Sequence, residues 1–202
     1  PLILTGLGVA LAFRMRFWNI GAEGQLTLGA VAAAGVALYW SQTLPAWTIL
    51  PLAILASCVA GAVWAGVPAV LKAKLNVDET LTTLMLNYVA ILYSEHLYYV
   101  AWRAEGYNSG TERIPEFAWL PRIAGRAHAG IFFGLVLALV LWMVFRYTKW
   151  GFELKIIGSN PIAARYLGIN IARNIVVTLL ISGAICGLAG GIEVLGLSRR
   201  LQ

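Results

Sequence analysis

Residues Gly24–Leu71 decide the fold class: GQLTLGAVAAAGVALYWSQTLPAWTILPLAILASCVAGAVWAGVPAVL contains no Asp, Glu, Lys or Arg. One transmembrane helix needs about 20 apolar residues, so this stretch is long enough for two. The polar and turn-forming residues Ser41–Pro45 lie near its middle. We therefore predict two membrane spans joined by a turn there, with Pro51 and Pro68 marking bends or ends of the second span.

The rest of the chain has the same character. Of its 202 residues, 60% are hydrophobic and 12% are charged, whereas soluble domains carry about 25% charged residues. The predicted fold is all-α, a polytopic transmembrane helical bundle that forms one domain over residues 1–202. The first apolar segment looks incomplete, so we expect a fragment of a longer protein. The expected segments are Pro1–Phe13, Gly24–Trp40, Trp47–Leu71, Thr80–Trp102, Gly130–Tyr147 and Ile175–Leu197.

Charge predicts the orientation of these spans. The net charge of +6 is read as a topology signal rather than as a nucleic-acid footprint, because cytoplasmic loops of membrane proteins are enriched in Lys and Arg. The loops around Arg14/Arg16, Lys72/Lys74 and Arg146–Arg173 hold most of the basic residues. We assign these loops to the cytoplasm, and the loop Arg103–His128 to the outside.

A short helix is predicted between the last two spans, in the stretch GSNPIAARYLGIN at Gly158–Asn170. Asn160 can cap its first turn, Pro161 suits the first helical position, and Gly168 can supply a left-handed C-terminal cap. A helix this short is not stable alone, so it packs either on the protein's own cytoplasmic face or on a separate partner. Ala163 and Ala164 are small enough to permit close approach to such a partner.

Small residues predict how the spans pack. Gly183, Gly187 and Gly191 recur every four residues in the last segment, and Gly29, Ala33 and Ala37 form a similar stripe in the second. This spacing lets helix backbones approach closely. Cys58 and Cys186 lie in apolar stretches and are interpreted as core cysteines, with no metal site and no cofactor site indicated by spacing.

Polar residues at the start of the second segment are the first candidates for a solute path. In NIGAEGQ (Asn19–Gln25), Asn19 or Gly21 can cap a helix, and Glu23 falls in its first turn. One interpretation is a capped helix at the membrane surface. The other, which we favour, is a broken-helix terminus that exposes Asn19, Glu23 and Gln25 to a solute path. Asn87, inside the fourth segment, is costly to bury and joins the same set.

Three further polar residues have no assigned role. Glu95 and His96 interrupt the fourth segment and fit either a proton relay or the interfacial belt, and Glu193 lies among the glycines of the last segment. The sequence contains no GxxxxGK[ST], HExxH, GxSxG or paired CxxC motif. Nothing in it therefore predicts catalysis or nucleotide binding by this chain.

Taken together, the motifs resemble the permease subunits of ABC importers in the branched-chain amino acid and simple-sugar superfamily, nucleoside-type branch. The similarity extends along nearly the whole chain, and the fourth motif is the most specific. The motifs are NIGAEGQLTLGA (Asn19–Ala30), NVDETLTTLMLNY (Asn76–Tyr88), RAHAG (Arg126–Gly130), WGFELKIIGSNPIAARYLGI (Trp150–Ile169) and SGAICGLAGGIEVLG (Ser182–Gly196).

The resemblance implies a function and a set of partners. It implies that Asn160, Pro161, Ala163, Ala164, Arg165 and Gly168 belong to a coupling helix that docks on a separate ATPase subunit. The other implied partners are a second permease subunit, a solute-binding lipoprotein and membrane lipids, in the plasma membrane of a bacterium or archaeon. The implied solute is small and polar, best a nucleoside, or a simple sugar.

Two alternatives remain at this point. An ion-coupled secondary transporter would use carboxylates such as Glu23 or Glu193 and would need no docking helix. An integral-membrane enzyme built around Glu95 and His96 would need a third catalytic group, which the sequence does not show.

Overall fold

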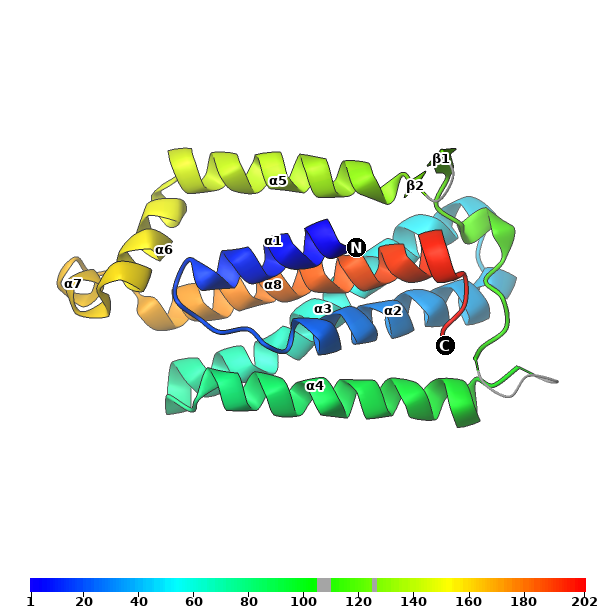
Figure 1. Cartoon of the computed structure of the whole chain (residues 1–202), viewed down its shortest axis with the longest axis horizontal. Coiled ribbons are helices and arrows are strands. Elements are labelled where there is room, and N and C mark those ends of the chain that lie inside the picture. The colour runs from blue at the N-terminus through cyan, green and yellow to red at the C-terminus, as the bar shows by residue number, and fades with distance from the viewer. Residues whose placement is uncertain (105–109, 125–126) are drawn as a thin grey trace.

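The structure, a computed structural model, describes residues 1–104, 110–124 and 127–202 and is a helical bundle (Figure 1). Arg126, the first residue of one motif quoted above, lies outside the described residues. The long helices are α1 (Leu2–Phe13), α2 (Ala22–Tyr39), α3 (Ala46–Leu75), α4 (Glu79–His96), α5 (Gly130–Tyr147) and α8 (Ile171–Glu193). Each of the six predicted apolar segments is thus a helix.

Shorter elements connect the long helices. Two of them are helices, α6 (Lys149–Ser159) and α7 (Pro161–Tyr166), and two are strands, β1 (Arg122–Ala124) and β2 (Ala127–His128), which pair antiparallel. Single 3₁₀ or π turns complete the described secondary structure: η1 (Trp40–Gln42), η2 (Leu97–Ala101), η3 (Glu116–Ala118) and η4 (Val194–Ser198).

Of the two possibilities predicted for Pro51 and Pro68, bends or ends, the structure excludes ends, and it adds a second helix between the last two spans. Neither Pro51 nor Pro68 ends the third segment, because α3 continues through both prolines; neighbouring helices can compensate for the hydrogen bonds that proline removes. The polar stretch between the last two spans holds α6 as well as α7. Thr148 is the N-cap of helix α6 and its hydroxyl accepts from the Gly151 amide, and the helix buries Leu154 and Ile157 on one face.

Three helical stretches among the described residues are long and apolar enough to cross a membrane: Ala46–Leu75, Gly130–Tyr147 and Ile171–Ser198. Helix α1 is equally apolar but shorter. Helices α2 and α4 lie alongside them in the bundle (Figure 1), and their Glu, Gln, Asn and Thr side chains make them more polar. The chain is therefore a multi-pass helical membrane protein.

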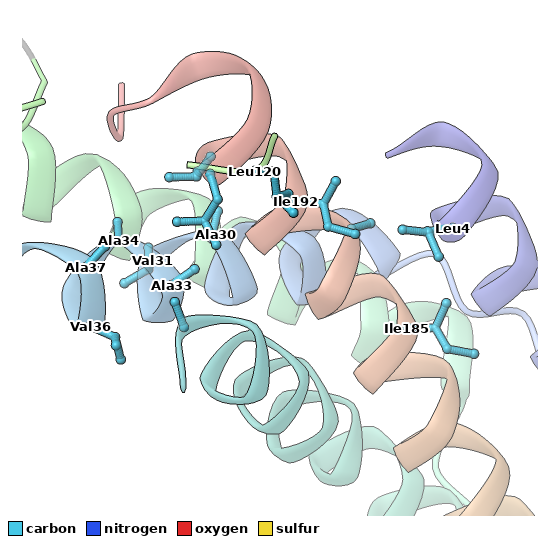
Figure 2. Packing of buried hydrophobic residues seen from close by; sticks show 14 of the residues in the cluster. Leu4, Ala30, Val31, Ala33, Ala34, Val36, Ala37, Leu120, Ile185 and Ile192 are labelled. Atoms are coloured by element: carbon cyan, nitrogen blue, oxygen red, sulfur yellow. The ribbon is translucent and has the colours of Figure 1, made fainter. Parts of the chain in front are cut away.

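Helices α2, α3 and α8 form the centre, and α1 packs against α8. On α3 the buried positions Ile49, Ala53, Ser57, Gly61 and Ala65 recur every four residues. This period places them on one helix face. The opposite face exposes apolar side chains, Leu55, Val59, Val63 and Val67, as expected of a helix whose outer surface meets lipid. Small residues also line the buried face of α2, and Figure 2 shows Ala30, Ala33, Ala34 and Ala37 there with Ile185 and Ile192 of α8.

Glycines allow the close contact between α8 and its neighbours. A Cβ at Gly187 would lie 2.9 Å from the Gly61 Cα and would meet the Ser57 carbonyl oxygen, and a Cβ at Gly183 would meet the Gly61 carbonyl. A Cβ at Gly191 would lie 2.6 Å from the Ser57 hydroxyl oxygen. The three glycines spaced four apart thus face α3, where any larger residue would force the backbones apart.

The connecting segments divide between the two ends of the bundle. The α1–α2 connection, the α3–α4 connection and α6–α7 lie at one end, and the α2–α3 connection, β1, β2 and the C-terminus lie at the other (Figure 1). A Cβ at Gly158 would touch the Arg14 carbonyl oxygen, so α6 packs on the α1–α2 connection. The segments assigned to the cytoplasm by charge therefore share one end; which side of the membrane it faces remains a prediction.

Candidate functional site

The Asn19 and Gln25 side chains bond to each other in the interior, at the start of α2. Each amide donates to the other's oxygen at 3.1 Å, and the two residues are 4% and 1% exposed. The Asn19 Nδ2 also reaches the Ser182 hydroxyl of α8 at 3.3 Å, and that hydroxyl donates to the Gly8 carbonyl of α1 at 2.7 Å. This network connects α1, α2 and α8. Because both buried amides are paired, their role is to hold these helices together.

The network changes the role predicted for Asn19. Gly21 is the N-cap residue of α2, and no side chain caps that helix. Of the two residues predicted as the N-cap, Asn19 or Gly21, the structure has Gly21, and the Asn19 amide is paired with Gln25 instead. Nothing in the sequence spacing alone pointed to Ser182 or Gly8 as partners, since they are far away along the chain.

Glu23 and Asn87 form a second polar pair, between α2 and α4. The Asn87 Nδ2 donates to a Glu23 carboxylate oxygen at 3.1 Å. Glu23 is exposed, whereas Asn87 is 7% exposed and its side-chain oxygen has no hydrogen-bond partner among the described residues. A Cβ at Gly24 would lie 3.0 Å from both the Asn87 Cα and that oxygen, so the glycine permits the close contact of the two helices. Among the described residues, the pair therefore contains one exposed carboxylate and one buried amide oxygen that accepts no hydrogen bond.

The threonines beside Asn87 are structural. The Thr83 hydroxyl donates to the Glu79 carbonyl at 2.7 Å, and the Thr82 hydroxyl donates to the Asp78 carbonyl at 2.9 Å. Asp78 itself caps α4 by accepting from the Leu81 amide at 2.9 Å. Hydroxyls bonded to their own helix backbone in this way are not available to a solute.

Helix α7 has the local structure that the sequence predicted. The Asn160 side chain accepts from the Ile162 and Ala163 amides at 3.0 and 3.1 Å, Pro161 occupies the first turn, and Gly168 has a φ of +73°. Ala164, in contrast, is fully buried within this chain. The expectation that Ala164 contacts a partner was therefore wrong.

The outward surface of α7 consists of other residues. Ile162 is 65% exposed, Tyr166 89% and Leu167 64%, and Arg165 is also exposed. Sequence reasoning missed these three large side chains because it looked for small residues. Ile162 and Tyr166 lie one turn apart on α7 and Leu167 is its C-cap residue, so the three form an apolar and aromatic surface patch at the end of the bundle.

Glu95, His96 and Glu193, the residues without an assigned role, lie in the last turns of α4 and α8. His96 is exposed and Glu95 is half-buried at the end of α4, and Glu193 is half-buried in the last turn of α8. Among the described residues, no group of three or more His, Cys, Asp or Glu side chains has a geometry that could hold a metal ion.

Comparison with known proteins gives a consistent result. Residues 1–200 match the family model described as "Branched-chain amino acid transport system / permease component". A guanosine ABC transporter permease protein, NupP of Bacillus subtilis, is 38% identical over 203 residues, which cover 97% of this chain and 57% of the relative. A glucose ABC transporter permease protein of Haloferax volcanii is 38% identical over 215 residues, covering 100% of this chain and 56% of the relative.

A nucleoside ABC transporter permease protein, NupB of Lactococcus lactis, is 29% identical over 201 residues, covering 94% of this chain and 55% of the relative. The chain thus spans about half the length of the curated relatives it matches. No solved structure matches it. These relatives are transport permeases, which argues against the secondary-transporter and membrane-enzyme alternatives. From this match along its whole length, the chain belongs to the branched-chain amino acid transport system permease family.

Proposed function

We propose that this chain forms the core of a permease subunit of an ABC importer. The subunit moves a small polar solute across the plasma membrane of a bacterium or archaeon, with ATP hydrolysed by a separate subunit. Its other partners are a second permease subunit, a solute-binding lipoprotein and membrane lipids. The family match supports this proposal, and relatives described as guanosine, nucleoside and glucose permeases support a nucleoside as the solute, with a simple sugar second.

The observation that carries the proposal is the exposed patch on α7. A helix of six residues is far below the length that is stable in isolation, yet it is well capped and held by the buried Ala164. The patch formed by Ile162, Tyr166 and Leu167 lies at the end of the bundle that we assign to the cytoplasm. An amphipathic helix with exposed apolar anchors fits a groove on a partner protein, and in this proposal the partner is the ATPase subunit.

The polar pair Glu23–Asn87 is our candidate for solute contact. Asn19 and Gln25 are left out of the path because their amides are paired with each other. Glu23 is exposed, and within the described part of the chain the buried Asn87 oxygen has no donor. A nucleoside base or a sugar offers N–H or O–H donors to the exposed Glu23 carboxylate, which the Asn87 amide contacts.

The α7 assignment is tested by Tyr166→Ala and Ile162→Ala in the full-length permease. Both variants should insert normally in the membrane, because the two side chains are mostly exposed. Co-purification of the ATPase should fall at least ~10-fold in the double variant, since truncating an interface anchor typically costs 2 kcal/mol or more. The matched control is Phe152→Ala on α6, which is 61% exposed near the same end. Undiminished ATPase co-purification by the double variant would refute the docking role of α7.

The solute path is tested by Asn87→Leu, which keeps a similar volume and removes the amide. Uptake of radiolabelled guanosine per folded complex should fall, with a smaller change in melting temperature. Unchanged uptake per folded complex with a lower melting temperature would show that Asn87 only links α2 to α4.

A further inference from the structure

A basic cleft lies where the C-terminal end of α3, helix α7 and the start of α8 meet. Its volume is about 460 Å³, and its walls include Lys72, Lys74, Asn76, Arg165, Ile171 and Ile175. Helix α3 is distant in the sequence from α7 and α8, which follow one another. The cleft is at the same end of the bundle as the α7 patch but is distinct from Ile162, Tyr166 and Leu167.

The polar wall of the cleft carries unbalanced positive charge. Lys72 is paired with the Glu79 carboxylate at 2.7 Å, and the described residues that line the cleft include no carboxylate. Among the described residues, Lys74 and Arg165 have no acidic partner within salt-bridge distance, and both are exposed. The Asn76 side chain adds amide donors beside them. The ligand that matches three cationic or donor groups is an anion.

The opposite wall is apolar. Ile171 and Ile175 lie one helical turn apart on α8, and the apolar part of α3 ends at Leu71, directly before Lys72. The cleft therefore spans the level at which the hydrocarbon region of a membrane gives way to its charged surface. A free phosphate ion would meet isoleucines on one side, whereas a phospholipid presents a phosphate and an acyl chain together.

We propose that this cleft binds an anionic phospholipid, with its phosphate contacted by Lys74 and Arg165 and its acyl chain along Ile171 and Ile175. Because Lys74 lies in the last turn of α3 and Arg165 belongs to α7, the bound headgroup links the short helix to the bundle. The binding step stands independently of the transport function proposed above. The consequence, that lipid supports ATPase coupling through α7, rests on that function.

The test uses the complete permease, purified in detergent and titrated with phosphatidylglycerol, phosphatidylcholine or inorganic phosphate. Binding is counted by native mass spectrometry and followed by melting temperature. Phosphatidylglycerol should bind and raise the melting temperature more than phosphatidylcholine does. Lys74→Gln should weaken phosphatidylglycerol binding about fivefold, the factor expected for one basic residue near an anionic surface.

Two variants serve as controls. Lys74→Arg keeps the charge and should retain binding, and Lys155→Gln removes a charge from the exposed face of α6, which does not line the cleft. Unchanged affinity in Lys74→Gln, or an equal loss in Lys155→Gln, would overturn the proposal. If inorganic phosphate raised the melting temperature as much as phosphatidylglycerol does, the cleft would be a site for a free anion, and the lipid proposal would also be overturned. A lower melting temperature with unaltered lipid affinity would show that Lys74 only complements the C-terminal dipole of α3.

ATPase coupling is measured separately, as solute-stimulated ATP hydrolysis of the assembled importer in nanodiscs with and without phosphatidylglycerol. Loss of phosphatidylglycerol from the cleft on assembly with the ATPase would show an acidic protein surface as the true occupant and would overturn the lipid proposal. Lipid binding that persists in an assembly without solute-stimulated hydrolysis would refute the importer function and leave the lipid site intact.

Discussion

Helices α5 and α8 have nearly the same apolarity but very different burial. The most apolar windows of the two spans have mean hydropathies of 2.0 and 2.3, yet 17% of the first and 61% of the second is buried. Helix α5 is composed largely of Leu, Val, Phe and Trp, whereas α8 has Gly183, Gly187, Gly190 and Gly191 on its packed faces. Lipid tails are as apolar as leucine. Hydropathy therefore determines whether a helix inserts in the membrane, whereas small residues determine whether it packs closely against another helix.

The strongest test of this contrast is Gly187→Leu in α8 against Val136→Leu in α5. The new side chain at position 187 would collide with the backbone of α3, because even a Cβ there lies 2.9 Å from the Gly61 Cα. We expect a loss of at least ~3 kcal/mol, the upper range for forcing methylenes into a packed core, and hence little folded protein. Val136 is 61% exposed. Fluorescence-detected size exclusion measures both, and equal yields of the two variants would contradict the contrast.

The hydrogen-bond network that joins the start of α2 to α8 through Asn19 and Ser182 is tested by Gln25→Leu. The change leaves the Asn19 amide without its main partner in the interior, which should cost ~1–3 kcal/mol of stability. The double variant Asn19→Leu/Gln25→Leu should be less destabilised than the sum of the single variants, because residues in one network are coupled. Thermal unfolding of the four proteins measures the coupling. Strict additivity would mean that the two amides do not act as a pair.

A smaller effect is expected on α5. Phe132 is 58% exposed, and Phe132→Ala should change the stability of the segment described here by ~0.5 kcal/mol or less, as is usual for surface positions. Comparing this variant in the 202-residue segment and in the full-length permease sharpens the contrast. A much larger loss of melting temperature in the longer protein would show that further protein covers α5.

No effect on stability is expected from the last test, which concerns the connector between α5 and α8. Ser159 is exposed on that connector, and Thr43 is exposed at the opposite end of the bundle. Ser159→Cys and Thr43→Cys are labelled in intact cells with a membrane-impermeant thiol reagent. Labelling of Cys at position 43 alone supports a cytoplasmic connector, and labelling at position 159 alone would reverse the orientation.

Local chemistry explains why much of this architecture was predictable. A charge-free apolar run predicts spans because each carries its own backbone hydrogen bonds into lipid, and the predicted turn at Ser41–Pro45 separates α2 from α3. Asn160, Pro161 and Gly168 act within one or two turns of their own positions, so the ends of α7 followed directly from them. The spacing of Gly183, Gly187 and Gly191 predicted close helix contact without naming α3 as the neighbour.

What the sequence by itself determined is therefore the class of the protein: a helical membrane bundle, its spans, and one capped helix between the last two. Only the tertiary structure decided that Asn19 pairs with Gln25 beside Ser182, that Ala164 faces inward while Tyr166 faces outward, and that Lys74 and Arg165 line the same cleft. Spans and caps depend on residues within a few turns of each other. Burial and pairing depend on which distant helix packs against each face, and nothing local in the sequence specifies that neighbour.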